Sequence, residues 1–314
     1  MKVDVRNFNG RLREAMVGSL PSIDFIQDQT GKKCSPLMTE IHGETMEDLN
    51  DLNTVLINLG IKVKSIDCQS LDEELNLATS LVVIDDRVFT SWPTSSIERY
   101  GFDNLTVVSP DKPFYFNGDN LLLTEDYLMF GYEKEKSHIE SFKQITKPIK
   151  INPFYNSETT GFISKDLCIS YESVEKTRRI YHTSENIDLS PYFMNARDTI
   201  REWDQFCKDK TKRCLTFDSE RNRQSLAKFF LSGYMIELID RYRKDLDNLF
   251  ETRIFDCRFI VVDRNTIISN TKNIKLIEHL NKKNINVIHT NWRHGLMFDT
   301  SLRQLVLAVR RDAE

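Results

Sequence analysis

Four β-hairpin patterns recur along the chain, and this repetition constrains the fold more than any other feature of the sequence. Each pattern has two short apolar stretches separated by a polar turn. The patterns lie at residues 80–89, 117–131, 159–172 and 257–270. Hairpins repeated at intervals of tens of residues are typical of closed, radially repeated architectures, because neighbouring units then cover each other's strand edges.

The N-terminal region adds a fifth unit of a different kind. Residues 11–18 predict a strand, 44–60 predict a helix that ends at Gly60, and the run IKVKSID at 61–67 predicts a second strand. Charged, helix-like segments follow the hairpins, as in NIKLIEHLNKKN. The sequence therefore predicts an α/β protein of five units.

One long segment departs from the hairpin pattern. Apolar residues recur there at helical spacing, at Leu226, Phe229, Phe230, Ile236, Ile239, Leu246 and Leu249. We therefore expect three regions. Units one to four occupy residues 1–182, a helical insertion occupies 183–253, and the fifth unit, which closes the repeat, occupies 254–314.

Composition excludes several classes of function. The formal net charge of −4 and the pI of about 6.0 argue against nucleic-acid binding, which needs an excess of Lys and Arg. The N-terminus has no secretory signal pattern, and no apolar run approaches the length of a membrane span. The six cysteines are scattered without metal-ligand spacing. We expect a cytoplasmic protein with reduced thiols, no metal and no cofactor, and without a membrane or nucleic-acid partner.

The five-unit pattern resembles the pentein superfamily, which includes arginine deiminases, dimethylarginine hydrolases and glycine amidinotransferases. The likeness runs through every unit except the helical insertion, and the last unit is the most specific. There, IVVDRNTIISNTKNIKLIEHLNKKNINVIHTNWRH followed by SLRQLVLAVRRD is similar to the amidinotransferase ending in strand order, helix length and the terminal V-R-R. The resemblance implies a five-unit pentein, an α/β propeller with an inserted helical subdomain.

The catalytic motifs of that family are changed at four places. The family's Arg-Asp pair is Ala78-Thr79 in this chain, and its E-G-G-D box is the run FNGD ending at Asp119. Its H-x-D motif aligns with Tyr155 and Ser157. Counting back from V-R-R places Gln304, within the expected last strand, at the position of the nucleophilic Cys.

These changes remove the chemistry that the family performs. Attack on a guanidinium carbon needs a thiolate, a carboxylate that binds the cation and a His that carries protons. Gln is not a nucleophile, and a Tyr with a pKa near 10 is a poor proton shuttle at neutral pH. We therefore expect no catalytic residue and a ligand-binding pocket lined by Asp119, Tyr155, Ser157, Gln304, Trp92 and Arg99. Simpler roles in turns, in a strand or in packing remain open for Asp119, Gln304 and the pair Trp92 and Arg99.

Two hypotheses about function follow. The favoured one is a non-catalytic binding or scaffold protein that has a protein partner or forms a homo-oligomer, with a guanidinium compound as the candidate small ligand. The alternative is an active amidinotransferase or other guanidino-modifying enzyme with relocated groups, for example a thiolate from Cys168 or Cys257. His289 and His294 are candidates for a displaced base, although loop histidines are more often surface groups. Cys257 reads most simply as a small core residue.

Overall fold

The computed structural model describes most of the chain outside its long central segment. The described residues are 1–31, 33–66, 75, 77–90, 98–107, 121–131, 142, 148–152, 155, 160–171, 183–189, 191–192, 257–295 and 300–313.

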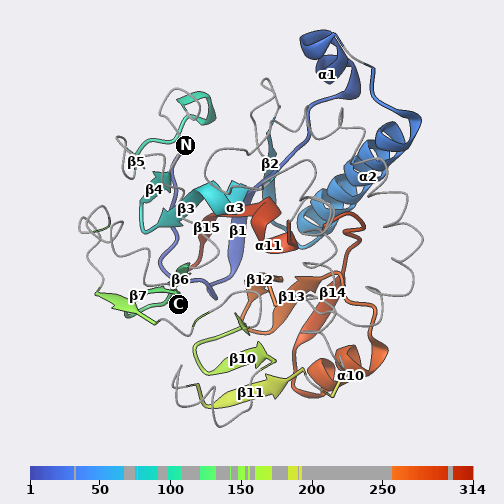
Figure 1. Cartoon of the computed structure of the whole chain (residues 1–314). Helices are drawn as coiled ribbons and strands as arrows, with labels where there is room; N and C mark the ends of the chain where they lie inside the picture. Colours follow the sequence, from blue (N-terminus) through green and yellow to red (C-terminus); the bar gives the residue numbers. More distant parts are fainter. Residues whose placement is uncertain are drawn as a thin grey trace.

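The strands in these ranges form five three-stranded sheets with one shared topology (Figure 1). In each sheet the central strand pairs antiparallel with one neighbour and parallel with the other. Four of the antiparallel pairs are the predicted hairpins, which are confirmed. The sheets are β15 (Val306–Arg311), β1 (Leu12–Val17) and β2 (Lys62–Ser65); β3 (Leu81–Ile84), β4 (Arg87–Thr90) and β5 (Leu105–Val107); β6 (Leu121–Leu123), β7 (Leu128–Phe130) and β8 (Ile149–Ile151); β9 (Thr160–Phe162), β10 (Leu167–Ser170) and β11 (Glu185–Asp188); and β12 (Ile260–Asp263), β13 (Thr266–Ser269) and β14 (Asn286–His289).

The first sheet joins the two ends of the chain. β1 pairs antiparallel with the C-terminal strand β15 and parallel with β2. The strands predicted at 11–18 and 61–67 are therefore confirmed. β15, which we assigned to the fifth unit, takes the place in this sheet that a hairpin strand takes in the other four.

Helices in the described ranges are few, and the longest is α2. The helices are α1 (Ile23–Thr30), α2 (Pro36–Asn58), α3 (Leu77–Ser80), the 3-10 turn η1 (Glu98–Tyr100), α10 (Ile274–Lys282) and α11 (Leu302–Leu305). α2 begins eight residues before the predicted 44 because Ser35 caps it by accepting a hydrogen bond from the Met38 N–H at 3.2 Å, and Pro36 occupies the first turn. It ends near Gly60, whose φ of 76° suits glycine.

α2 packs one apolar face on the first sheet. Leu49, Leu52 and Leu56 on this face are buried in a core cluster with residues of β1 and β15. Burying each leucine contributes about 1.5–3 kcal/mol, so packing holds this helix in place more than helix propensity does. None of the helices in the described part of the chain combines the length and hydrophobicity that crossing a membrane requires.

Four apolar clusters join the sheets in sequence. The cluster under α2 includes Ile260 and Val262 of β12 together with β1 and β15. A second links β1 and β15 to β3, β4, β6 and β7, a third links β10 and β11 to β12 and β13, and a fourth links β6 and β7 to β9 and β10. Each sheet therefore shares buried side chains with at least two others.

The expected helical insertion needs a corrected boundary. Residues 185–188, inside the predicted range 183–253, form the strand β11, which pairs parallel with β10. Ile187 of β11 is buried in the third cluster, so apolar packing places this segment with the fourth unit. The apolar residues on which the insertion was predicted lie outside the described residues.

Candidate functional site

Gln304, which the resemblance places at the family's nucleophile position, lies in the short helix α11 (Leu302–Leu305) and not in a strand as expected. Its side-chain Oε1 accepts a hydrogen bond from the backbone N–H of Ser301 at 2.7 Å, and the side chain is only 5% exposed. A Ser followed three residues later by Gln is a helix-start signature, and this contact forms half of a capping box. The strand β15 therefore begins only at Val306, and the Gln304 amide has a structural partner.

Tyr155, at the family's His position, is buried against the β9 residue Phe162. The two ring centroids are 6.0 Å apart, and Tyr155 is 3% exposed. The phenol oxygen lies 3.4 Å from Nη1 of Arg303, at the long end of hydrogen-bond distances. Arg303 directly precedes Gln304, so this contact joins the Tyr155 segment to the helix that carries Gln304.

Arg303 reaches a third segment through its other terminal nitrogen. Nη2 donates to the backbone carbonyl of Leu121 at 3.0 Å. Leu121 is the first residue of β6 and stands two positions after Asp119. One half-buried guanidinium therefore contacts both the strand that follows the FNGD run and the Tyr155 segment.

The Ala78-Thr79 position also lies close to α11. It falls within α3, and α3 and α11 pack side by side near the centre of the view in Figure 1. Segments from three of the four altered motifs thus meet around α11. Asp119, Ser157 and Trp92 lie outside the described residues, and Arg99 belongs to η1 but its side chain is outside the described part.

The two cysteines considered as relocated nucleophiles, Cys168 and Cys257, are both buried. Cys168 lies in β10, and its Sγ donates to Oδ1 of Asn186 at 3.1 Å. Burial raises the pKa of this thiol to about 12, so it is protonated at neutral pH and unreactive. Cys257 is 2% exposed and belongs to the third apolar cluster, which confirms the expectation of a core residue.

His294 is buried, which corrects the expectation of a surface group. Its Nε2 lies 2.7 Å from Oε2 of Glu44 on α2, and the residue is 4% exposed. Burial lowers the pKa of His294, although Glu44 and Asp48 partly offset this effect. His289, the other candidate base, is exposed at the end of β14.

An ion-pair network attaches the loop before α11 to α2. Asp48 is 1% exposed on its side chain, and its carboxylate accepts from the backbone N–H of Arg293 at 2.7 Å and from its Nε at 2.9 Å. Arg293 also pairs with Glu47 at 2.8 Å. Burial raises the pKa of Asp48 even though Arg293 lowers it. The sequence prediction missed this network, although Glu44 and Asp48 are spaced to share one face of a helix.

Sequence comparisons and structural comparisons give different results. No family model matches the chain, and no curated protein matches it. Among solved structures, an amidinotransferase of saxitoxin biosynthesis from Microseira wollei is 13% identical, with a TM-score of 0.61 over 99% of this chain and 98% of that one. The inosamine-phosphate amidinotransferase of Streptomyces griseus is 14% identical, with a TM-score of 0.61 over 99% and 97%.

A hydrolase shows the same likeness. The dimethylarginine dimethylaminohydrolase of Pseudomonas aeruginosa, solved with citrulline, is 6% identical, with a TM-score of 0.56 over 95% of this chain and 99% of that one. Identities this low carry information about the fold alone, and all three structures are penteins. The likeness extends over almost the whole length of each chain. The chain has the α/β fold of the pentein superfamily, as the resemblance of its sequence implied.

Proposed function

We propose that this chain is an amidinotransferase-like pentein that has lost the Cys, His and carboxylate catalytic set and serves as a non-catalytic binding or scaffold protein. The observation that carries the proposal is the position of Arg303. Its guanidinium contacts Tyr155, at the position to which the resemblance assigns proton transfer, and the Leu121 carbonyl, in the strand that follows the FNGD run. A guanidinium of the chain's own therefore occupies this region.

The neighbouring groups support the same conclusion. The Gln304 side chain is engaged in capping α11, and an amide cannot attack a guanidinium carbon. A phenol is a weaker proton shuttle than the imidazole that the family carries at the position the resemblance assigns to Tyr155. Because catalytic groups act as a unit, each replacement alone removes most of the rate.

The alternative, an active amidinotransferase or guanidine hydrolase with relocated groups, has less support. It requires a thiolate, and the raised pKa of Cys168 together with its bond to Asn186 argues against that residue. Cys257 is packed among apolar side chains, where a thiolate is poorly solvated.

The proposal also covers how the five sheets are arranged and which residues belong to each unit. The five sheets close into a five-unit propeller, because each shares a buried cluster with at least two others and β15 joins the two chain ends. Units one to four extend through β11 (Glu185–Asp188), the predicted helical insertion follows β11 up to residue 253, and 254–314 completes the ring. The protein acts in the cytoplasm with a protein partner or as a homo-oligomer.

Turnover assays test the loss of catalysis. The purified chain is expected to release neither ornithine nor citrulline from arginine, and to form no amidino-glycine, above the uncatalysed background. A rate that disappears when one of the six native cysteines is alkylated would overturn the proposal. The same assay with a heat-denatured sample of the chain measures the uncatalysed background rate.

Ligand binding tests the role of Arg303. Replacing Arg303 with Ala removes the internal guanidinium, so free guanidinium or arginine is expected to bind the variant at least about tenfold more tightly than the unmodified chain, by isothermal titration calorimetry. Arg13→Ala is the matched control, because Arg13 pairs with Asp312 and contacts neither Tyr155 nor Leu121. Equal affinity in the unmodified chain and in Arg303→Ala would contradict an internal occupant.

A further inference from the structure

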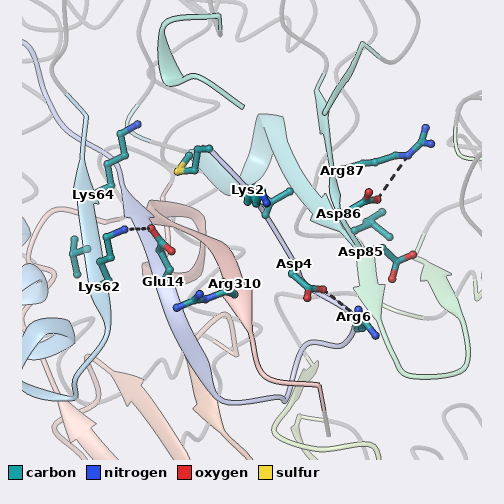
Figure 2. Close-up of a pocket in the computed structure, with 14 residues that line it drawn as sticks. Lys2, Asp4, Arg6, Glu14, Lys62, Lys64, Asp85, Asp86, Arg87 and Arg310 are labelled. Atoms are coloured by element: carbon teal, nitrogen blue, oxygen red, sulfur yellow. Dashed lines mark hydrogen bonds and ion pairs between the residues drawn. The ribbon is translucent and has the colours of Figure 1, made fainter. Parts of the chain in front are cut away.

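A groove of about 1160 Å³ lies at the other end of the first sheet (Figure 2). Its lining comes from residues 1–4, the strands β1 and β2, the β3–β4 turn and the end of β15. β15 runs from α11 toward this groove, and Val306 and Arg310 are four residues apart, about 13 Å along a strand. The groove is therefore separate from the region around Tyr155 and Gln304.

Two compensating β-bulges give Arg310 its place in the groove. Ala15 pairs with Ala308 and Leu12 pairs with Arg311, a spacing of three residues on each strand. Between these pairs Glu14 is opposite Arg310, with register shifts on both sides. In an unbroken ladder Glu14 would face Val309 instead. The bulges thus bring Arg310 to the face that carries Glu14, and bulges commonly re-aim a side chain next to a functional site.

Backbone contacts fix the wall opposite β2. Val5 exchanges two hydrogen bonds with Asp85, at 2.9 and 2.7 Å. Asp4 donates to the Val309 carbonyl at 3.0 Å and accepts from the Arg311 N–H at 2.9 Å. The N-terminal segment therefore joins β15 to the β3–β4 turn, and these backbone hydrogen bonds hold this wall of the groove in place.

Ion pairing inside the groove leaves a surplus of positive charge. Three of its four carboxylates have a cationic partner, at 2.8 Å for Glu14 with Lys62, 3.1 Å for Asp4 with Arg6 and 4.0 Å for Asp86 with Arg87. The remaining lining charges are Lys2, Lys64 and Arg310 against Asp85. This local surplus contrasts with the formal net charge of −4 for the whole chain.

Arg310 is the cation best placed to bind a ligand. Its side chain is exposed, and it makes no hydrogen bond or ion pair with any residue in the described ranges. Its charge helps to lower the pKa of Asp312, whose carboxylate is bonded to Arg13. Lys64 already donates to the Tyr100 carbonyl at 3.1 Å, so Arg310 and Lys2 are the remaining lining cations whose side chains have no partner among the described residues.

We propose that this groove binds a small organic anion through a phosphate or carboxylate group held by Arg310, with Lys2 contributing at the rim. The planar guanidinium presents parallel N–H donors that match the oxygens of either group. The groove is much larger than a single anionic group and slightly larger than typical small-molecule sites of about 300–1000 Å³, so the ligand carries a further moiety along β2.

Titration of the full-length chain with pyrophosphate and with succinate, at constant ionic strength, tests the proposal. Saturable binding is expected in calorimetry, with dissociation constants in the millimolar range or tighter for at least one probe. Arg310→Gln is expected to weaken it by at least about tenfold. Lys282→Gln is the matched control, because it removes one exposed charge on α10, outside the groove, and is expected to change nothing.

The measured affinities distinguish a phosphate ligand from a carboxylate ligand, and they also show whether the groove binds anions at all. Tighter binding of pyrophosphate indicates a phosphate ligand, and tighter binding of succinate indicates a carboxylate. Absence of saturable binding to both probes, unchanged affinity in Arg310→Gln, or equal loss in Lys282→Gln would overturn the proposal. If Arg310→Gln does not fold, the affinities of Arg310→Lys and Lys2→Gln for the two probes are measured instead. Unchanged affinity in both variants overturns the proposal.

Discussion

The two ends of β15 use arginine in opposite ways. Just before its beginning, Arg303 in α11 is half-buried and donates to Tyr155 and to the Leu121 carbonyl. Near its end, the Arg310 side chain is exposed in a groove and has no hydrogen-bond or ion-pair partner among the described residues. The same side chain is thus a packing group in one place and a free binding group in the other.

This difference extends to the surrounding charges. Near α11, Asp48 and His294 are buried and hydrogen-bonded within the chain. In the groove, the ion pair between Lys62 and Glu14 has one highly exposed partner. The region around α11 is therefore held together by internal contacts, whereas the opposite end of the sheet leaves charge available for a ligand.

Breaking the buried network at Asp48 is expected to have the largest effect. Asp48→Ala leaves the Arg293 N–H and Nε without their carboxylate acceptor, and hydrogen bonds to charged groups contribute about 1.5–3 kcal/mol each. We expect the free energy of unfolding to fall by about 2–4 kcal/mol in urea denaturation. Asp51→Ala, at an exposed position on the same helix, is the control and is expected to stay within about 0.5 kcal/mol.

Gln304→Cys sharpens the comparison at the beginning of β15. The thiol cannot reproduce the Oε1 contact to the Ser301 N–H, so stability is expected to fall by about 1 kcal/mol. Arginine turnover is expected to stay at background, because the position lacks a His partner. Gln304→Glu keeps an acceptor at this position and is expected to retain stability. Thiol-dependent turnover in Gln304→Cys would show that the remaining groups suffice for catalysis.

Gln304 also shows what the sequence could and could not predict. The hairpins were predictable because turn residues and β-branched stretches are local signals. The Ser301-x-x-Gln304 signature was equally local, but the V-R-R anchor favoured reading a continuous strand, and so the helix α11 was missed. The third strand of most units was missed because three or four residues carry little periodicity, and their pairing depends on distant partners.

Other features needed the tertiary structure. The double bulge that turns Arg310 toward the groove depends on the register between the two ends of the chain, which no local pattern records. The burial of His294 likewise depends on the docking of its loop against α2. The contact of Arg303 with Tyr155 joins segments 148 residues apart.

Acidification is expected to lower the free energy of unfolding because two buried histidines, His42 and His294, must gain a proton. Burial lowers the pKa of His42, even though its Nε2 donates to the Pro21 carbonyl at 2.8 Å, and burial lowers the pKa of His294 in the same way. A lowered folded-state pKa means that the unfolded chain binds more protons below about pH 6.5, so stability falls as the pH drops from that value.

The pH effect is measured by comparing unfolding curves at pH 7.5 and 5.5. His42→Gln removes one of these groups and is expected to reduce the loss by up to about 1 kcal/mol. Asp48 has the opposite sign, because a raised carboxyl pKa favours the folded state on acidification. The difference between the unmodified chain and His42→Gln isolates the histidine, and an identical pH dependence in both would contradict its assignment.

The smallest effect is expected at the exposed pair in the groove. Lys62 is 76% exposed on its side chain, so solvent screens its 2.8 Å contact with Glu14, and such pairs contribute about 0.2–1 kcal/mol. Lys62→Met is therefore expected to change the free energy of unfolding by less than about 1 kcal/mol at 0.15 M salt, and by less still at 1 M salt. The same variant releases the Glu14 carboxylate beside Arg310, so pyrophosphate binding in the groove is expected to weaken even though stability hardly changes. A large loss of stability in Lys62→Met would show that the groove is a packed structural element like the region around α11, and the contrast between the two ends of β15 would then disappear.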